Sequence, residues 1–152
     1  MSNLYNQIMF NLRNGIYKYI GEGSSREVYD LNNEYVLKVA KNKAGLAQNR
    51  SEYKIYKKDN SKLFANILYA SDDYNFIIMR KAKKVHDISD VWNYFNVSSK
   101  FEFYNLSFIR RLRNKYNLIL ADLNRPSSWG IIDKKYVIID YGFTIDVKEK
   151  HY

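Results

Sequence analysis

Apolar residues near the start of the chain recur at two different spacings. Leu4, Ile8 and Leu12 follow helical spacing, which predicts a short amphipathic helix over residues 3–14. Beyond Gly15 the spacing changes to alternation, which is typical of strands with one buried face. The alternating stretches predict a meander of three strands, at residues 16–20, 26–31 and 35–40.

The next part of the chain again places a helix before strands. The pattern of apolar residues predicts a helix over residues 45–59, with Glu52 near its middle. Two apolar runs, at 66–70 and 75–80, then predict a pair of strands. The basic run Lys81–Lys84 connects them to the rest of the chain.

Helical spacing dominates the second half, and two short apolar runs follow it. The run at 118–120 leads to Asp122, and the run at 136–139 leads to Asp140. With Ala121 included in the first, each run has the four residues of a short buried strand. The expected helices cover residues 87–95 and 99–116. This order of elements predicts an α+β fold with a β-rich first half and a helical second half.

Composition narrows the class of protein. A chain of 152 residues that is 46% hydrophobic can bury one real core. It has no cysteine, which excludes disulfides and thiolate metal sites. We find no apolar run long enough for a membrane span and no signal peptide, so we expect a cytoplasmic protein. The net charge of +9 favours a polyanionic partner, although lysines that merely aid solubility explain it equally well.

Three features suggest phosphate chemistry. Gly21-x-Gly23 lies between two predicted strands, where glycine lets the backbone lie close over phosphates. Lys38 interrupts an apolar strand, so it is either an edge lysine or a functional one. Two carboxylates held at strand ends, Asp122 and Asp140, are what a metal-assisted phosphate site needs.

These features occur in an order that resembles the protein-kinase-like superfamily. The stretch from Gly21 to Val28 resembles its glycine-rich loop, and Val36-Leu37-Lys38 resembles its V-A-I-K strand. Asp122-Leu123 resembles the Asp-Leu of H-R-D-L, and Asp140-Tyr141-Gly142 resembles D-F-G. The resemblance covers residues 16–144.

The resemblance implies a single bilobal domain over residues 1–152. Its N-lobe would be an antiparallel sheet with one αC-like helix, and its C-lobe would be a reduced helical one. The implied divisions are an N-terminal helix at 1–15, the N-lobe at 16–80, a hinge at 81–84 and the C-lobe at 85–152.

ATP and Mg²⁺ are the cofactors that the resemblance implies. Lys38 would contact phosphates and pair with Glu52, and Asp122 would orient or deprotonate an attacking hydroxyl. Asp140 and Ser128 would hold Mg²⁺. The residues expected around the nucleotide are Gly21, Gly23, Ser24, Ser25, Val28, Val36, Lys38, Met79 and Lys81.

Several positions depart from the pattern. Arg26 replaces the third glycine of the loop, which predicts a looser lid over the phosphates. Leu120 and Ala121 stand in place of the histidine and arginine of H-R-D. The metal-binding asparagine is replaced by serine, and Asn124 comes too early to take its role. No activation segment follows, so the chain resembles compact bacterial or phage-borne members of the superfamily.

Three functions remain open at this point. The first is an ATP-dependent phosphotransferase that transfers the γ-phosphate to a hydroxyl. The second is a degenerate kinase fold from a phage or mobile element that acts as an inhibitor or regulator of a macromolecular partner. The third is a nucleic-acid-binding protein that uses the basic runs Arg110–Arg113 and Lys81–Lys84.

Overall fold

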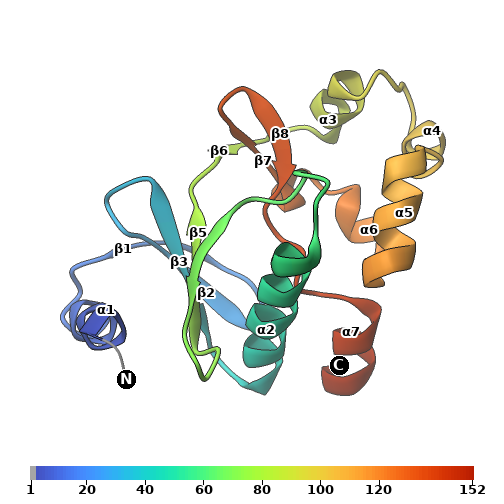
Figure 1. Cartoon of the computed structure of the whole chain (residues 1–152). Coiled ribbons are helices and arrows are strands. Elements are labelled where there is room, and N and C mark those ends of the chain that lie inside the picture. Colours follow the sequence, from blue (N-terminus) through green and yellow to red (C-terminus); the bar gives the residue numbers. More distant parts are fainter. Residues whose placement is uncertain (1–2) are drawn as a thin grey trace.

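Two antiparallel sheets and several helices make up the structure, a computed structural model that describes residues 3–152 (Figure 1). This confirms the α+β class, whereas the division into two lobes stays a prediction. Residues 1 and 2 of the predicted segment 1–15 lie outside the described residues. The helices are α1 (Asn3–Arg13), α2 (Lys43–Lys58), α3 (Ile88–Tyr94), α4 (Lys100–Tyr104), α5 (Ser107–Tyr116), α6 (Leu120–Leu123) and α7 (Ile145–His151), with a 3-10 turn η1 (Pro126–Ser128).

Two sheets contain all the strands of the described residues. The larger sheet has the order β1-β2-β3-β5-β4, and the smaller one has the order β6-β7-β8. The strands are β1 (Lys18–Glu22), β2 (Arg26–Asp30), β3 (Tyr35–Ala40), β4 (Ile67–Ala70), β5 (Phe76–Arg80), β6 (Lys83–Lys84), β7 (Trp129–Ile132) and β8 (Lys135–Ile138). The basic run at 81–84, expected as a plain connector, therefore contributes a short strand that pairs with β7.

The centre of the larger sheet is β3, which carries Lys38. Lys38 lies opposite Val28 of β2 and Ile77 of β5, so strands flank it on both sides. Its side chain is buried. The alternative of an edge lysine is therefore wrong.

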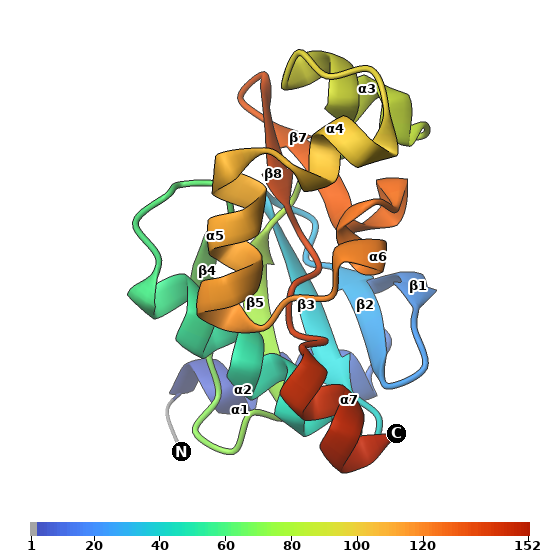
Figure 2. The same cartoon turned by 90° about the vertical axis from the view of Figure 1, so that its right-hand side faces the viewer.

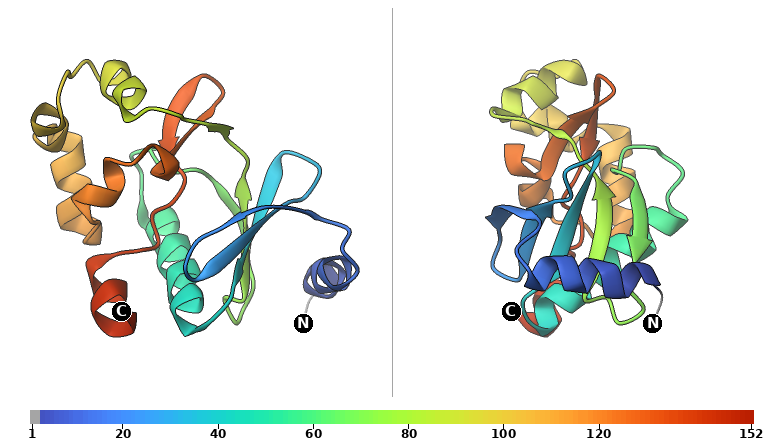
Figure 3. Two further views of the ribbon diagram at one scale, coloured as in Figure 1. Left: turned by 180° about the vertical axis from the view of Figure 1, so that it is seen from behind. Right: turned by 90° about the vertical axis from the view of Figure 1, so that its left-hand side faces the viewer.

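Alternate residues of the central strands face opposite sides of the sheet. Leu37 and Ile78 pack with Ile8 of α1, which covers one face. Val36 and Met79 belong to the main core on the other face, where α2 and the later helices lie. Figures 1 and 3 show α1 and α2 on opposite sides of the strands. The alternating pattern of the central strands therefore places side chains in both hydrophobic cores, one on each face of the sheet.

The helix predicted over 99–116 is two helices. Asn105 ends α4, and its side-chain amide donates to the carbonyl of Phe101 at 2.8 Å. Leu106 then takes an extended conformation before α5 begins at Ser107. The asparagine side chain competes with the helical backbone for a carbonyl, which helical spacing alone does not reveal.

The strand predicted at 118–120 is also wrong. Leu118 makes only an isolated bridge with Thr144, and the chain then turns into α6. The amide of Asp122 donates to the carbonyl of Ile119 at 3.0 Å, so Asp122 lies in a helical turn rather than at the end of a strand. Asp140 does follow a strand, β8, as predicted.

The segment after β8 returns to the larger sheet. Figure 2 shows it running down to α7, which lies beside α2. Because of this return, the residues after Ile138 lie against α2 and the central strand. Within residues 3–152, no helix combines the length and apolar character that crossing a membrane requires.

Candidate functional site

A buried ion pair joins the central strand to α2. Nζ of Lys38 lies 2.6 Å from Oε1 of Glu52 and also donates to the carbonyl of Ile139. Glu52 lies mid-helix and is fully buried. The structure therefore brings together two residues that the sequence predicted as partners, and the chain after β8 completes the contact.

Arg26 is a second cation on the same carboxylate. Its Nη1 and Nη2 atoms each lie 3.2 Å from an oxygen of Glu52. Nη1 also donates to Oδ1 of Asn49 at 3.0 Å, and Nη2 donates to Oδ1 of Asp140 at 3.1 Å. Sequence reasoning treated Arg26 only as a replaced loop glycine and missed these contacts.

Each charged group of this cluster favours the ionised form of its oppositely charged neighbours. Burial alone would raise the pKa of Glu52, but the charges and hydrogen bonds of Arg26 and Lys38 lower it to about 2. Burial disfavours the charged form of Arg26, yet Glu52 and Asp140 raise its pKa. Burial lowers the pKa of Lys38, an effect that Glu52 opposes. Glu52 is thus ionised at neutral pH.

The segment Asp140-Tyr141-Gly142 crosses α2 beside this cluster. The amide of Tyr141 donates to Oε2 of Glu52 at 3.0 Å, and its hydroxyl donates to the carbonyl of Ala65 at 3.0 Å. A Cβ at Gly142 would overlap the carbonyl group of Gln48 in α2. Glycine is therefore required for this close approach, while the preceding Asp140 keeps a half-exposed side chain.

The loop that holds Asp122 is stabilised by its own side chains. Ser128 Oγ donates to the carbonyl of Asp122 at 2.6 Å, and Asn124 Oδ1 accepts from Trp92 at 3.0 Å. The Asp122 carboxylate lies 3.5 Å from Nη1 of Arg125. Burial, as the largest cause, raises the pKa of Asp122 above its ordinary value.

Two adjoining cavities contain most of the predicted site residues. The Lys38 cavity encloses about 270 Å³, and the Asp122 cavity about 220 Å³. They share Gly23, Ser24, Gln48, Ser127 and Asp140. Predicted residues that line one or both are Gly23, Ser24, Ser25, Val28, Val36, Lys38, Met79, Lys81, Asp122, Ser128 and Asp140. Gly21 lies outside this lining in β1, and Glu52 lies behind Lys38.

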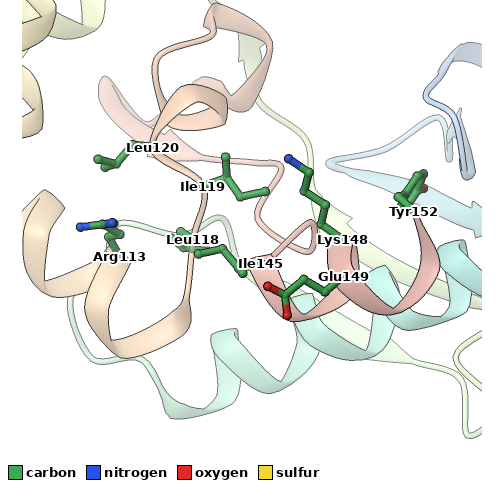
Figure 4. A pocket seen from close by; sticks show the side chains of 8 residues that line it. All are labelled: Arg113, Leu118, Ile119, Leu120, Ile145, Lys148, Glu149 and Tyr152. Atoms are coloured by element: carbon green, nitrogen blue, oxygen red, sulfur yellow. The ribbon is translucent and has the colours of Figure 1, made fainter.

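A third cavity continues from the Asp122 cavity. This Lys148 cavity encloses about 550 Å³ and shares Leu118 and Ile119 with its neighbour. Figure 4 shows the Arg113 and Lys148 side chains near this apolar floor. Shared lining residues place the three cavities next to one another, from the central strand to the helices α5 and α7. Sequence reasoning did not predict this third space.

Tyr152 connects the last helix to the loop before β2. Its hydroxyl lies 3.2 Å from Oγ of Ser24, contacts Oγ of Ser25, and accepts from Nε2 of Gln48 at 3.1 Å. No pattern in the sequence indicated this contact, because it joins positions 128 residues apart. The Tyr152 side chain, from the helical half of the chain, therefore holds this loop in place.

Magnesium ligation was predicted for Asp140 and Ser128. In the structure, Asp140 is paired with Arg26, and the Ser128 hydroxyl is directed to the carbonyl of Asp122. Within residues 3–152, no group of three or more histidine, aspartate or glutamate side chains is arranged to hold a metal ion. The roles of the two residues toward Mg²⁺ stay predictions.

Known proteins resemble the chain in structure rather than through a family model. No protein-family model matches the chain. No curated protein matches it. The chain is similar to the solved structure described as the streptomycin-ATP-APH(2")-IIa ternary complex, with 25% sequence identity and a TM-score of 0.42. The likeness covers 66% of this chain and 35% of that chain, so the matched region is about a third of the longer protein.

Proposed function

We propose that the Lys38 cavity binds ATP and that the site transfers the γ-phosphate to a hydroxyl. The observation that carries this proposal is the buried Lys38–Glu52 pair in the wall of a cavity bordered by Gly23–Ser25. A lysine fixed by a carboxylate keeps its ammonium in one place, where it offers charge to a phosphate. The glycine at position 23 lets the loop backbone approach the same group.

The lining of the Lys38 cavity suits the parts of ATP. Val28, Val36 and Met79 provide apolar surface for the adenine ring. Gly23 and Ser24 also line the Asp122 cavity, so the phosphates would extend toward that side, past Lys38 and Ser25 in the wall of the Lys38 cavity. The amide of Lys81 already donates to the carbonyl of Glu34 at 2.7 Å, so this amide is not the group that binds adenine.

Asp122 is suited to act on the attacking hydroxyl. The acceptor oxygen would attack the γ-phosphorus as the bond to the β-phosphate oxygen breaks, and ADP would leave. The acceptor proton would pass to the Asp122 carboxylate, whose raised pKa favours proton capture. The Lys148 cavity shares Leu118 and Ile119 with the cavity that Asp122 lines, and it would give the acceptor a place to bind.

The residues predicted to hold Mg²⁺ do not fit a metal ion as they are arranged. One oxygen of Asp140 accepts from Arg26, and Ser128 is hydrogen-bonded within its own loop. We therefore assign no step of the transfer to a metal. Lys38 and Arg26 are the cations of the buried cluster, and both line this cavity.

Transfer of radioactive label tests the proposal. The protein is incubated with γ-labelled ATP, with and without MgCl₂, and labelled protein and released phosphate are measured together with ADP. We expect ADP formation that Lys38→Ala and Asp122→Asn each reduce at least tenfold. Asp72→Asn, an exposed change at a distant turn, is the matched control. Equal ADP formation by the wild type and Asp122→Asn would contradict the role of Asp122.

A basic groove supports a second candidate function, the binding of single-stranded nucleic acid. The groove lies between α2 and α7, encloses about 800 Å³ and has one lining carboxylate, Asp146. Its exposed cations are Lys43, Arg50, Lys54, Lys58, Lys115 and Lys150. Among residues 3–152, no salt bridge includes any of these six. On α2, Arg50, Lys54 and Lys58 repeat every four residues, about 6 Å apart along the helix, which suits a chain of phosphates.

Fluorescence anisotropy with a labelled single-stranded RNA tests this second function. We expect binding at low salt that weakens steeply as salt is added. The double variant Lys54→Glu with Lys58→Glu should abolish it, whereas Lys134→Glu with Lys135→Glu, at the start of β8, should not. Equal losses of binding in both double variants would show that RNA binding depends on net charge and not on this groove. The basic runs first predicted for this role, and the docking of a protein partner, stay predictions.

A further inference from the structure

Arg26 lies between two carboxylates of the site. Its guanidinium makes two contacts of 3.2 Å with Glu52 and one of 3.1 Å with Asp140. The two carboxylates come from α2 and from the segment after β8, so the arginine joins distant parts of the chain. This places a fixed positive charge directly on Asp140.

Buried hydrogen bonds fix the position of this guanidinium. Arg26 is only 6% exposed and begins β2, where its carbonyl accepts from the amide of Gly23 at 2.9 Å. Asn49 accepts from Nη1, and its own amide donates to the carbonyl of Tyr74 at 2.9 Å. A buried bidentate arginine of this kind is rigid, unlike an exposed surface pair. The contact with Asp140 is therefore part of the fold.

The contact between Arg26 and Asp140 changes the charge that the phosphates of a triphosphate would encounter in the cavity. A bare Asp140 carboxylate would repel phosphate oxygens, and a divalent cation between them is the usual remedy. Here Arg26 and Lys38 balance Glu52 and Asp140, so the cluster carries no net charge before ATP arrives. A metal ion at Asp140 would instead meet the guanidinium that already contacts that carboxylate.

We propose that Arg26 takes the place of a divalent cation at Asp140, so that the site binds a nucleoside triphosphate without a metal ion. This rests on the proposed function, because it assumes that ATP occupies the Lys38 cavity, which Arg26 and Asp140 both line. Arg26 is a positioning residue in this sense: it neutralises Asp140 and holds Glu52 against Lys38. The glycine expected at this position would leave Asp140 free for a metal ion.

Isothermal titration of the whole chain with ATP, in excess MgCl₂ and in excess EDTA, tests the proposal. For the wild type we expect Kd values that agree within about twofold in the two buffers, a difference below about 0.4 kcal/mol. For Arg26→Gln we expect the Kd in EDTA to be at least about tenfold weaker than in MgCl₂, because Asp140 is then unpaired and a metal ion restores the balance. Arg26→Lys keeps the charge and should show a smaller dependence on MgCl₂.

A second variant keeps the test valid if Arg26→Gln does not fold. Asp140→Asn changes a half-exposed side chain, and its thermal unfolding is measured first. We expect this variant to bind ATP more tightly than the wild type in EDTA, because a negative charge is removed. If Asp140 instead binds a metal ion with the nucleotide, Asp140→Asn will weaken binding in MgCl₂.

The possible failures are distinguishable. If the wild type binds ATP at least about tenfold more tightly in MgCl₂ than in EDTA, the inference about Arg26 is overturned and the ATP site stands. If the wild type binds no ATP in either buffer, the proposed function itself is overturned, and the inference fails with it.

Discussion

Nζ of Lys38 lies 2.6 Å from Oε1 of Glu52, although the two residues are 14 positions apart in the sequence. The lysine is fixed by the central strand of the sheet, and the glutamate by the middle of α2. The same carboxylate also accepts from Arg26 and from the amide of Tyr141. Glu52 therefore holds together groups from the central strand, from β2 and from the segment after β8.

Glu52→Gln should strongly destabilise the fold. The change leaves the buried cations Lys38 and Arg26 without their shared counter-charge. Removing one partner of a buried ion pair costs about 3–5 kcal/mol of the free energy of unfolding. Chemical denaturation measures this loss. Glu34→Gln, in an exposed turn, is the control and should change the free energy by less than about 0.5 kcal/mol.

Stability should fall in acid because of the same residue. The pKa of Glu52 is about 2 in the folded protein and 4.5 in the unfolded chain, so its contribution is complete above pH 4.5. It is lost as the pH falls from 4.5 toward 2, and the full difference corresponds to roughly 3 kcal/mol. Unfolding curves measured across this range should show the decline. If Glu52→Gln folds and declines just as steeply, other groups cause the acid sensitivity.

Gly142→Ala should destabilise the protein by packing alone. A methyl group at this position would overlap the carbonyl of Gln48 and lie 3.1 Å from Oε2 of Glu52. We expect a loss of about 1–3 kcal/mol, which is typical of an overpacked core. Gly21→Ala is the matched control, because a Cβ there has no neighbour within 4 Å. Equal thermal unfolding of both variants would contradict the close approach of Gly142 to α2.

Tyr152→Phe should loosen the loop before β2. The change removes the hydroxyl that contacts Ser24, Ser25 and Gln48 and leaves the ring in place. Amide hydrogen exchange, read by mass spectrometry, should become faster at residues 23–26. Tyr94→Phe, in α3, provides the comparison and should leave exchange at this loop as in the wild type. Unchanged exchange in Tyr152→Phe would show that the hydroxyl does not hold the loop.

Local patterns predicted the elements of the larger sheet well. Alternation placed β2 and β3 close to their observed bounds, and helical spacing placed α2. These elements follow from residues that are near one another in the sequence. The same patterns misjudged residues 118–120 and 99–116, because a short apolar run fits a helix as well as a strand and a single asparagine ended a helix.

The site was less predictable, because its contacts join distant positions. The resemblance singled out Lys38, Glu52, Asp122 and Asp140, and the first two form an ion pair. It gave Arg26 no role, although a buried arginine contacts two of these residues. The one available signal was a charged residue in place of a loop glycine. No sequence pattern indicated the contacts that the Tyr152 hydroxyl makes.

Amide chemical shifts during an ATP titration test the central claim most directly, because they show where the nucleotide binds. Because ATP is an anion, it could bind either in the Lys38 cavity or in the basic groove between α2 and α7. These two sites are lined by different residues, so the shifts distinguish them. We predict that the largest shift changes occur at residues 23–25 and 81–82 and that Lys38→Met removes them. Changes confined to the amides around Arg50, Lys54 and Lys150, or no changes at all, would contradict an ATP site in the Lys38 cavity.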